Sequence, residues 1–239
     1  MNLVFDIGNT NTKMALFEGA ELQCMQTVKT VDAATLKDFC KGATLENIYA
    51  SVVGLMPHWN EIIPAGIPIH IVDASVTLPF ENDYGTPHTL GSDRIAAMVG
   101  ALLHHSEPLL VIDAGSCITL DYLDENRHYR GGAILPGLQM KLNALHTFTD
   151  RLPLLTLNNV EQLPIVGNNT EQSIVAGTLT ATVLALEAFI ERYRQMLTSP
   201  LHVVMTGGDS RLLQRLVDVN IAIDPYLVLH GTNAIFRNK

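Results

Sequence analysis

The sequence repeats one short pattern in its first and second halves. Residues 6–12 read DIGNTNT, and residues 113–119 read DAGSCIT. Each segment follows an apolar run and precedes a second strand-like run, with a glycine between them, so each predicts a strand–turn–strand hairpin. Two copies of one hairpin in 239 residues predict two similar halves, which divide between residues 107 and 110.

Strands and helices are expected to alternate around these hairpins. Apolar runs predict strands at 47–53, 67–72, 128–135 and 202–205. Helices are expected at 33–41, 91–105 and 171–197, after Pro136, and from a cap at Asp209 or Ser210 to Val217. This interleaved order indicates an α/β architecture.

Composition excludes several classes of partner. Lys and Arg number 15 against 24 Asp and Glu, which gives a formal net charge of −9. Such an acidic chain lacks the positive surface that binds nucleic-acid backbones or anionic lipid, so neither nucleic acid nor a membrane is expected as a partner. The apolar stretch 174–190 includes Gly177 and Glu187, and it predicts a buried helix rather than a membrane span.

The three cysteines, at positions 24, 40 and 117, form no CxxC pair and are expected in the core. Their odd number favours a reduced, cytoplasmic compartment over a disulfide scaffold. The N-terminal segment has no basic region and carries Asp6, so no ordinary signal peptide is expected.

The first hairpin turn has the features of a phosphate-binding site. Around Gly8, backbone N–H groups can approach an anion with no Cβ atom in the way. Neighbouring Asn and Thr side chains add donors, Lys13 supplies a positive charge, and Asp6 could hold a hydrated metal ion. The alternative is an ordinary hairpin whose Asn and Thr residues only satisfy the turn.

The second turn, Asp113-Ala114-Gly115-Ser116, offers the same chemistry in the other half. Two such turns facing one another would clamp a polyphosphate. A purely structural hairpin is again the alternative, with Asp121 and Asp124 at its solvated far end.

Residues 91–94 read GSDR and open the expected helix 91–105. At a helix N-terminus the dipole favours a charged aspartate, and a carboxylate such as Asp93 can accept a hydroxyl proton late in a loose phosphoryl transfer. Arg94 could pair with a carboxylate or phosphate. The alternative is that Asp93 only caps the helix and Arg94 lies on the surface.

Other motifs are weaker or missing. The GGDS segment at 207–210 lies between a strand and a helix and would let a nucleoside approach the backbone, although such turns are common. The sequence contains no P-loop, no GxGxxG fingerprint, no HExxH motif and no protein-kinase HRD or DFG motif.

Six segments together resemble type III pantothenate kinases, bacterial enzymes of coenzyme A biosynthesis within the actin, hexokinase and Hsp70 superfamily. In chain order they are DIGNTNTK (6–13), GSDR (91–94), DAGSCITLD (113–121), GGAILPGLQMKLNAL (131–145), GNNTEQSI (167–174) and TGGDS (206–210). The resemblance covers nearly the whole chain. The joint occurrence of GxDR, GGxIxPG and GNNT is its most specific part.

The resemblance implies an actin-like α/β fold, with two ribonuclease H-like halves and a nucleotide cleft between them. Residues 1–109 would form the half with the first phosphate motif, and residues 110–239 the half with the second phosphate and adenosine motifs. ATP would be bound by Asp6, Ile7, Gly8, Asn9, Thr10, Asn11, Thr12, Lys13 and Ser116. The family pattern places a monovalent cation, K⁺ or NH₄⁺, at Asp113, and Asp6 could hold Mg²⁺ through water. The family commonly has Thr where this chain has Ser116, so a hydroxyl is kept and a methyl is lost.

The same resemblance implies the substrate site and the assembly. Gly91, Ser92, Asp93 and Arg94 match the pantothenate-binding segment, with Asp93 as the proton acceptor. Tyr84 and Thr170 match further substrate positions, and Thr170 could also cap the long helix. The neighbouring subunit completes this site in the family, so a homodimer is implied.

The expected reaction is therefore ATP-dependent phosphorylation of pantothenate to 4′-phosphopantothenate, the first step of coenzyme A biosynthesis. Two alternatives remain at this point. One is a kinase of another small hydroxyl or carboxyl substrate on the same fold. The other is a non-catalytic, nucleotide-binding regulatory relative.

Overall fold

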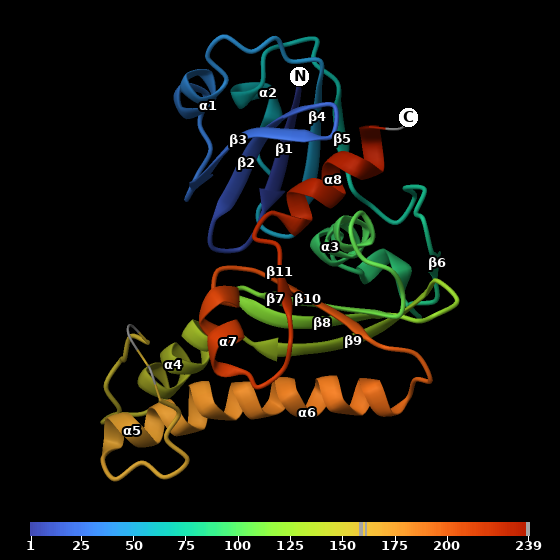
Figure 1. The fold of residues 1–239 in the computed structure, drawn as a ribbon. Coiled ribbons are helices and arrows are strands. Elements are labelled where there is room, and N and C mark those ends of the chain that lie inside the picture. The colour runs from blue at the N-terminus through green and yellow to red at the C-terminus, as the bar shows by residue number, and fades with distance from the viewer. Residues whose placement is uncertain (158–159, 161, 238–239) are drawn as a thin grey trace. The chain divides into compact units, whose positions relative to one another are not determined.

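The computed structural model describes residues 1–157, 160 and 162–237 (Figure 1). By their internal contacts they form two compact units. The first contains Met1–Ser106, the short segment Arg127–Arg130 and the chain from Tyr226 through the last helix. The second contains Glu107–Asn126 and the described part of Gly131–Pro225. The units therefore divide near the expected boundary, but the C-terminal helix belongs to the first of them.

The first unit is built on a five-stranded sheet in the order β3-β2-β1-β4-β5. Its strands are β1 (Asn2–Ile7), β2 (Thr12–Glu18), β3 (Glu21–Val28), β4 (Asn47–Val52) and β5 (Ile69–Ile71). The first three are antiparallel, whereas β4 runs parallel to both β1 and β5. Because β1 and β4 lie inside the sheet, they read as continuous apolar runs, and both are almost wholly buried.

Five helical segments accompany this sheet: α1 (Ala33–Phe39), α2 (Trp59–Ile62), the 3₁₀ turn η1 (Pro87–Thr89), α3 (Ser92–Leu102) and α8 (Leu227–Arg237). In Figure 1, α3 and α8 cross next to one another, although they come from distant parts of the sequence. Glycines allow this close approach, because a Cβ atom on Gly231 would lie 1.7 Å from the carbonyl oxygen of Ala96.

The second unit contains most of a six-stranded sheet in the order β11-β10-β7-β8-β9-β6. Its strands are β7 (Leu109–Ala114), β8 (Cys117–Leu123), β9 (His128–Pro136), β10 (His202–Thr206) and β11 (Ala222–Ile223). Strand β9 starts within the first unit, where it pairs with β6 (Glu81–Asn82). Strands β7 and β8 form an antiparallel hairpin, and β10 runs parallel to β7 and β11.

A long helix provides much of the core of the second unit. It runs without a break through α5 (Thr170–Val175), the π-helical turn η2 (Ala176–Thr180) and α6 (Ala181–Gln195), and α4 (Leu138–Thr147) and α7 (Ser210–Leu216) accompany it. By length and composition alone this helix, Thr170–Gln195, could cross a membrane. However, Leu179, Val183 and Leu186 are buried against sheet residues such as Leu110 and Leu120, as expected for the core helix of a globular unit.

The structure confirms both predicted hairpins and the long helix, and it corrects several details. Pro136 is the last residue of β9 and does not open a helix, because α4 starts after Gly137. Asp121 is 1% exposed and so does not lie at a solvated end. Cys24 is exposed on β3, outside the core. Strand β3 and helix α8 were not predicted at all.

Candidate active site

The first predicted phosphate turn joins β1 to β2, both of which lie in the first unit. The N–H of Gly8 donates to the carbonyl oxygen of Asn11 at 3.1 Å, which closes the turn. Asn9, Thr10 and Asn11 are exposed at its tip, whereas Thr12 is buried in the strand that follows. The turn therefore presents backbone and amide groups to solvent from a rigid, buried base.

Asp6 and Lys13 face one another at the base of this turn. They are paired in register across the hairpin, and Lys13 Nζ lies 3.7 Å from Asp6 Oδ2. Burial raises the pKa of Asp6 above its usual value, and the positive charge of Lys13 opposes this rise only in part. A cation near the Asp6 carboxylate would favour its charged form further, and carboxylate oxygens are ligands that Mg²⁺ prefers.

The GSDR segment forms the start of α3 in the same unit. Gly91 is the N-cap residue, and Asp93 Oδ1 accepts a hydrogen bond of 2.8 Å from the N–H of Arg94. A Cβ atom on Gly91 would lie 2.4 Å from that same Oδ1. The sequence therefore provides the one residue that lets the Asp93 carboxylate lie over the helix N-terminus.

Arg94 and Tyr84 interact, which the sequence alone did not predict. The guanidinium carbon of Arg94 lies 5.5 Å from the centre of the Tyr84 ring, a cation–π arrangement. Arg94 is 7% exposed, so the alternative of a surface arginine is wrong. Tyr84 is half-buried, and its N–H donates to Asn82 Oδ1 at 3.1 Å, which fixes the backbone before it.

The side chain of Ser92 points into the protein. Ser92 is 8% exposed, and its hydroxyl makes hydrogen bonds to Ser51 and to the backbone of Val52. Any contact of Ser92 with a substrate would therefore come from its backbone. Ser51 did not stand out in the sequence, because nothing local marks a serine inside an apolar strand as the partner of a residue 41 positions away.

The second predicted phosphate turn joins β7 to β8 in the second unit. Gly115 N–H donates to the carbonyl oxygen of Cys117 at 2.9 Å, and Ser116 is exposed at the tip. Gly137 N–H donates to the carbonyl oxygen of Ser116 at 3.1 Å. A Cβ atom on Gly137 would lie 2.4 Å from the Gly115 oxygen, so only glycine at this position can approach the turn closely enough to make this hydrogen bond.

The GGDS segment packs against the other side of this turn. Gly207 has a φ of +93°, and a Cβ atom there would lie 2.5 Å from Asp113 Oδ1. The N–H of Asp209 donates to the carbonyl oxygen of Ala114 at 3.0 Å, and burial raises the pKa of Asp209. Asp209 makes no side-chain cap, whereas the Ser210 hydroxyl donates to the Gly207 oxygen at 2.7 Å.

Asp113 is half-buried among these backbone segments. Its carboxylate oxygens are ligands of the kind that hard cations prefer. No cluster of three or more His, Cys, Asp or Glu side chains that could hold a metal ion occurs within the described residues. Any cation at Asp6 or Asp113 would therefore also need backbone, water or phosphate oxygens.

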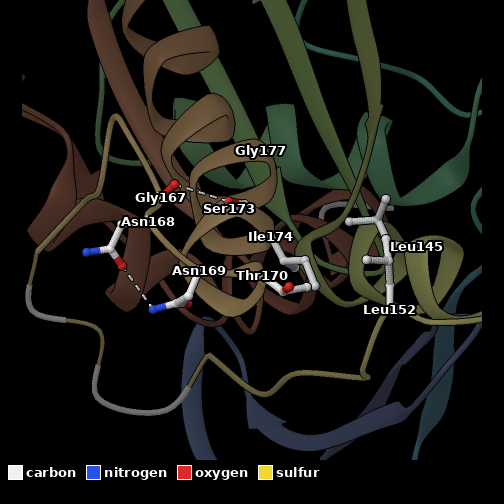
Figure 2. Close-up of a pocket in the computed structure, with 9 residues that line it drawn as sticks. All are labelled: Leu145, Leu152, Gly167, Asn168, Asn169, Thr170, Ser173, Ile174 and Gly177. Atoms are coloured by element: carbon white, nitrogen blue, oxygen red, sulfur yellow. Dashed lines mark hydrogen bonds between the residues drawn. The ribbon is translucent and has the colours of Figure 1, made fainter.

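Thr170 lies at a pocket in the second unit, which Figure 2 shows in close-up. The pocket has a volume of about 560 Å³ and is lined by Leu145, Leu152, Gly167, Asn168, Asn169, Thr170, Ser173, Ile174 and Gly177. Asn169, rather than Thr170, caps the long helix, because its Oδ1 accepts a hydrogen bond of 2.9 Å from the N–H of Gln172. Thr170 is exposed, and its hydroxyl is not needed for the cap.

The sequence as a whole is similar to one family of known proteins. A family model described as type III pantothenate kinase matches residues 2–192. The type III pantothenate kinase of Christiangramia forsetii is 36% identical over 247 residues, which cover 99% of this chain and 98% of that protein.

Two solved structures show the fold. A Baf family protein from Campylobacter jejuni has a TM-score of 0.66 at 23% identity, with 99% of this chain and 98% of that chain covered. A ROK family glucokinase from Streptomyces griseus in complex with glucose and AMPPNP has a TM-score of 0.51 at 11% identity, with 100% and 99% covered.

Two mixed α/β units, each with a strand–turn–strand hairpin, give the chain an actin-like fold, as the resemblance of its motifs implied. Within that class the full-length similarity is specific. The chain belongs to the type III pantothenate kinase family, which confirms the resemblance of its motifs.

Proposed function

We propose that this chain transfers the γ-phosphoryl group of ATP to the primary hydroxyl of pantothenate, the first step of coenzyme A biosynthesis. The observation that carries the proposal is a full-length match to type III pantothenate kinases in a chain whose GSDR segment sets a carboxylate over a helix N-terminus. The hydroxyl oxygen bonds to the γ-phosphorus, the bond from that phosphorus to the β,γ-bridging oxygen breaks, and ADP leaves. The hydroxyl proton passes to Asp93.

Phosphate binding falls to the two glycine turns. Residues 6–13 and Ser116 supply backbone N–H groups, amides and hydroxyls, and Lys13 supplies the positive charge that an otherwise acidic chain needs beside a triphosphate. Pantothenate binding falls to Tyr84, the 91–94 segment and Thr170. In this arrangement the Arg94 guanidinium packs on the Tyr84 ring, so replacing either residue would remove a contact that orients the other.

Two cations belong to the proposal. Mg²⁺, held through water near Asp6, would neutralise charge on the phosphate oxygens when bound. K⁺ or NH₄⁺ at Asp113 would reduce the repulsion between the triphosphate and the acidic protein. Equal activity in potassium and in sodium buffers would remove Asp113 from this role.

Homodimerisation also belongs to the proposal. Large apolar side chains near the Thr170 pocket are exposed, among them Phe148 (84%), Ile165 (72%) and Val166 (82%). Exposed apolar side chains gathered along one part of a chain mark an interaction surface. A second copy that covered them would also approach the proposed pantothenate site. Such an enzyme would act in the cytoplasm, as the unpaired cysteines suggest.

The test is ADP release measured with pantothenate, glucose, N-acetylmannosamine and acetate as acceptors, each in potassium and in sodium buffer. We expect turnover with pantothenate alone, and faster turnover in potassium. Turnover with one of the other acceptors would support a different kinase on this fold. ATP binding without turnover of any acceptor would support the regulatory alternative.

A further inference from the structure

The end of β4 makes hydrogen bonds in two directions within the first unit. On one side it reaches the first phosphate turn. The N–H groups of Val53 and Gly54 both donate to the carbonyl oxygen of Ile7, each at 3.0 Å. The backbone of Gly54 also packs against Gly8, because a Cβ atom on Gly54 would lie 2.3 Å from the Gly8 carbonyl oxygen.

On the other side the same strand end reaches the start of α3. The Ser92 hydroxyl accepts a hydrogen bond of 2.9 Å from Val52 N–H and donates one of 3.1 Å to the Val52 oxygen. The two serine hydroxyls lie 3.0 Å apart. Either hydroxyl can be the donor between them. Ser51 is 0% exposed, so water does not compete for the bond between the two serines.

We infer that the segment Ser51–Gly54, here called the β4 connector, fixes the position of Asp93 relative to the first phosphate turn. Ser51 and Ser92 act as positioning residues in this scheme, and neither side chain needs to touch a substrate. The inference rests on the proposed function, because it assumes that Asp93 is the proton acceptor and that the turn at Gly8 binds phosphate. A displacement of about 1 Å between such groups can cost about a hundredfold in rate.

Hydrogen bonds suit this task better than apolar packing does. Apolar contacts are non-directional, so two elements held by them alone can slide along one another. The bonds of the connector are directional. The bond between Ser51 and Ser92 is buried and those between Ser92 and Val52 are partly buried, so a shift would leave these groups without equally good partners. Both sets of bonds start from consecutive residues, the last two of β4 and the two that follow it. The turn and the start of α3 are therefore held to the same short segment.

The serines are tested with Ser92→Ala, Ser51→Ala and the double variant. We expect Ser92→Ala to lower kcat with pantothenate about ten- to a hundredfold while the KM for ATP stays within about twofold. Ser51→Ala should have a smaller effect. The double variant should be close to Ser92→Ala alone, because Ser51 acts through Ser92 and the two effects are not independent.

The matched control is Thr232→Val. It also deletes a buried hydroxyl from the first unit, but Thr232 Oγ1 has no hydrogen-bond partner among the described residues, so its kcat should equal that of the wild type. A folded Ser92→Ala protein with wild-type kcat would overturn the inference. So would a fall in kcat that only matches the fraction of unfolded protein, measured by circular dichroism at the assay temperature.

Gly54→Ala tests the other side of the connector. Its new Cβ pushes on the Gly8 carbonyl, so we expect weaker ATP binding, measured directly by calorimetry, and a smaller change in kcat at saturating ATP. Wild-type ATP affinity in folded Gly54→Ala would overturn this half of the inference. If the wild type itself does not phosphorylate pantothenate, the proposed function fails, whereas the ATP affinity of Gly54→Ala still tests the connector.

Discussion

The charged carboxylate of Asp6, which is proposed to bind hydrated Mg²⁺, lowers the stability of the fold. Burial raises its pKa in the folded protein, so the fold favours the protonated carboxyl relative to the unfolded chain. Stability from this group is therefore present at low pH and is lost as the pH rises through the folded-state pKa. Above that pKa the charged Asp6 costs stability, which Lys13 at 3.7 Å offsets only in part.

We therefore expect Asp6→Asn to raise the melting temperature at pH 7. The gain should shrink as the pH falls towards 4, because wild-type Asp6 then becomes neutral as well. Turnover should fall at the same time, since the carboxylate proposed to bind hydrated Mg²⁺ is gone. Calorimetry at pH 4 to 8 measures the first effect, and a lower melting temperature at pH 7 would contradict it.

Replacing Gly91 should displace the Asp93 carboxylate and lower kcat. In Gly91→Ala the new Cβ would lie 2.4 Å from Asp93 Oδ1, so the carboxylate must leave its place over the helix N-terminus. We expect kcat with pantothenate to fall by about tenfold or more while ATP affinity is kept, because a misplaced proton acceptor affects the chemical step. An unchanged kcat would show that the position of this carboxylate does not matter.

At the scale of elements, the contact between α3 and α8 holds the middle and end of α3. Gly100 and Gly231 let the two backbones touch, and a Cβ atom on Gly231 would lie 1.7 Å from the Ala96 oxygen. We expect Gly231→Ala to destabilise the protein by about 1–3 kcal/mol or more, measured by urea unfolding, because backbone must move. Gly177→Ala, where a Cβ meets nothing within 4 Å, should not destabilise the protein. Equal stability of both variants would contradict this account.

The elements also show what local sequence can and cannot predict. The hairpins at 6–12 and 113–119 were predictable because a glycine turn between two apolar runs is a local signal. Helix α8 was not predicted, although its apolar residues lie on one face; eight of its residues are buried where it packs against α3 and the first sheet. Strand β3 was missed because it is mostly exposed and has no apolar alternation.

In the candidate site, too, residues in local motifs could be predicted and contacts between distant residues could not. Asp6, Lys13, Asp93 and Asp113 could be predicted as candidates because each lies in a short motif with glycines at fixed positions. The supporting contacts were not found. Ser51 meets Ser92 across 41 positions and Gly137 supports the turn at Ser116, so both depend on tertiary structure that no local pattern encodes.

At the scale of the whole molecule, the proposed homodimer predicts that a charge on its apolar surface disrupts the dimer. Val166→Asp places a charge on an exposed apolar side chain next to the Thr170 pocket, and it should convert dimers to monomers in light scattering. Pantothenate turnover should fall with dimer content, whereas the phosphate turns should still bind ATP. Met196→Asp, on an equally exposed residue beyond the far end of α6, is the control and should stay dimeric. A monomeric wild type with full activity would contradict the dimer.

The most direct test of the account is the rate of the Asp93→Asn variant. Asparagine keeps the shape of the side chain but cannot accept the hydroxyl proton, so kcat with pantothenate should fall about 10²- to 10⁴-fold while ATP affinity stays near that of the wild type. Turnover near the wild-type rate would show that Asp93 is not the proton acceptor and would contradict the mechanism proposed for this chain.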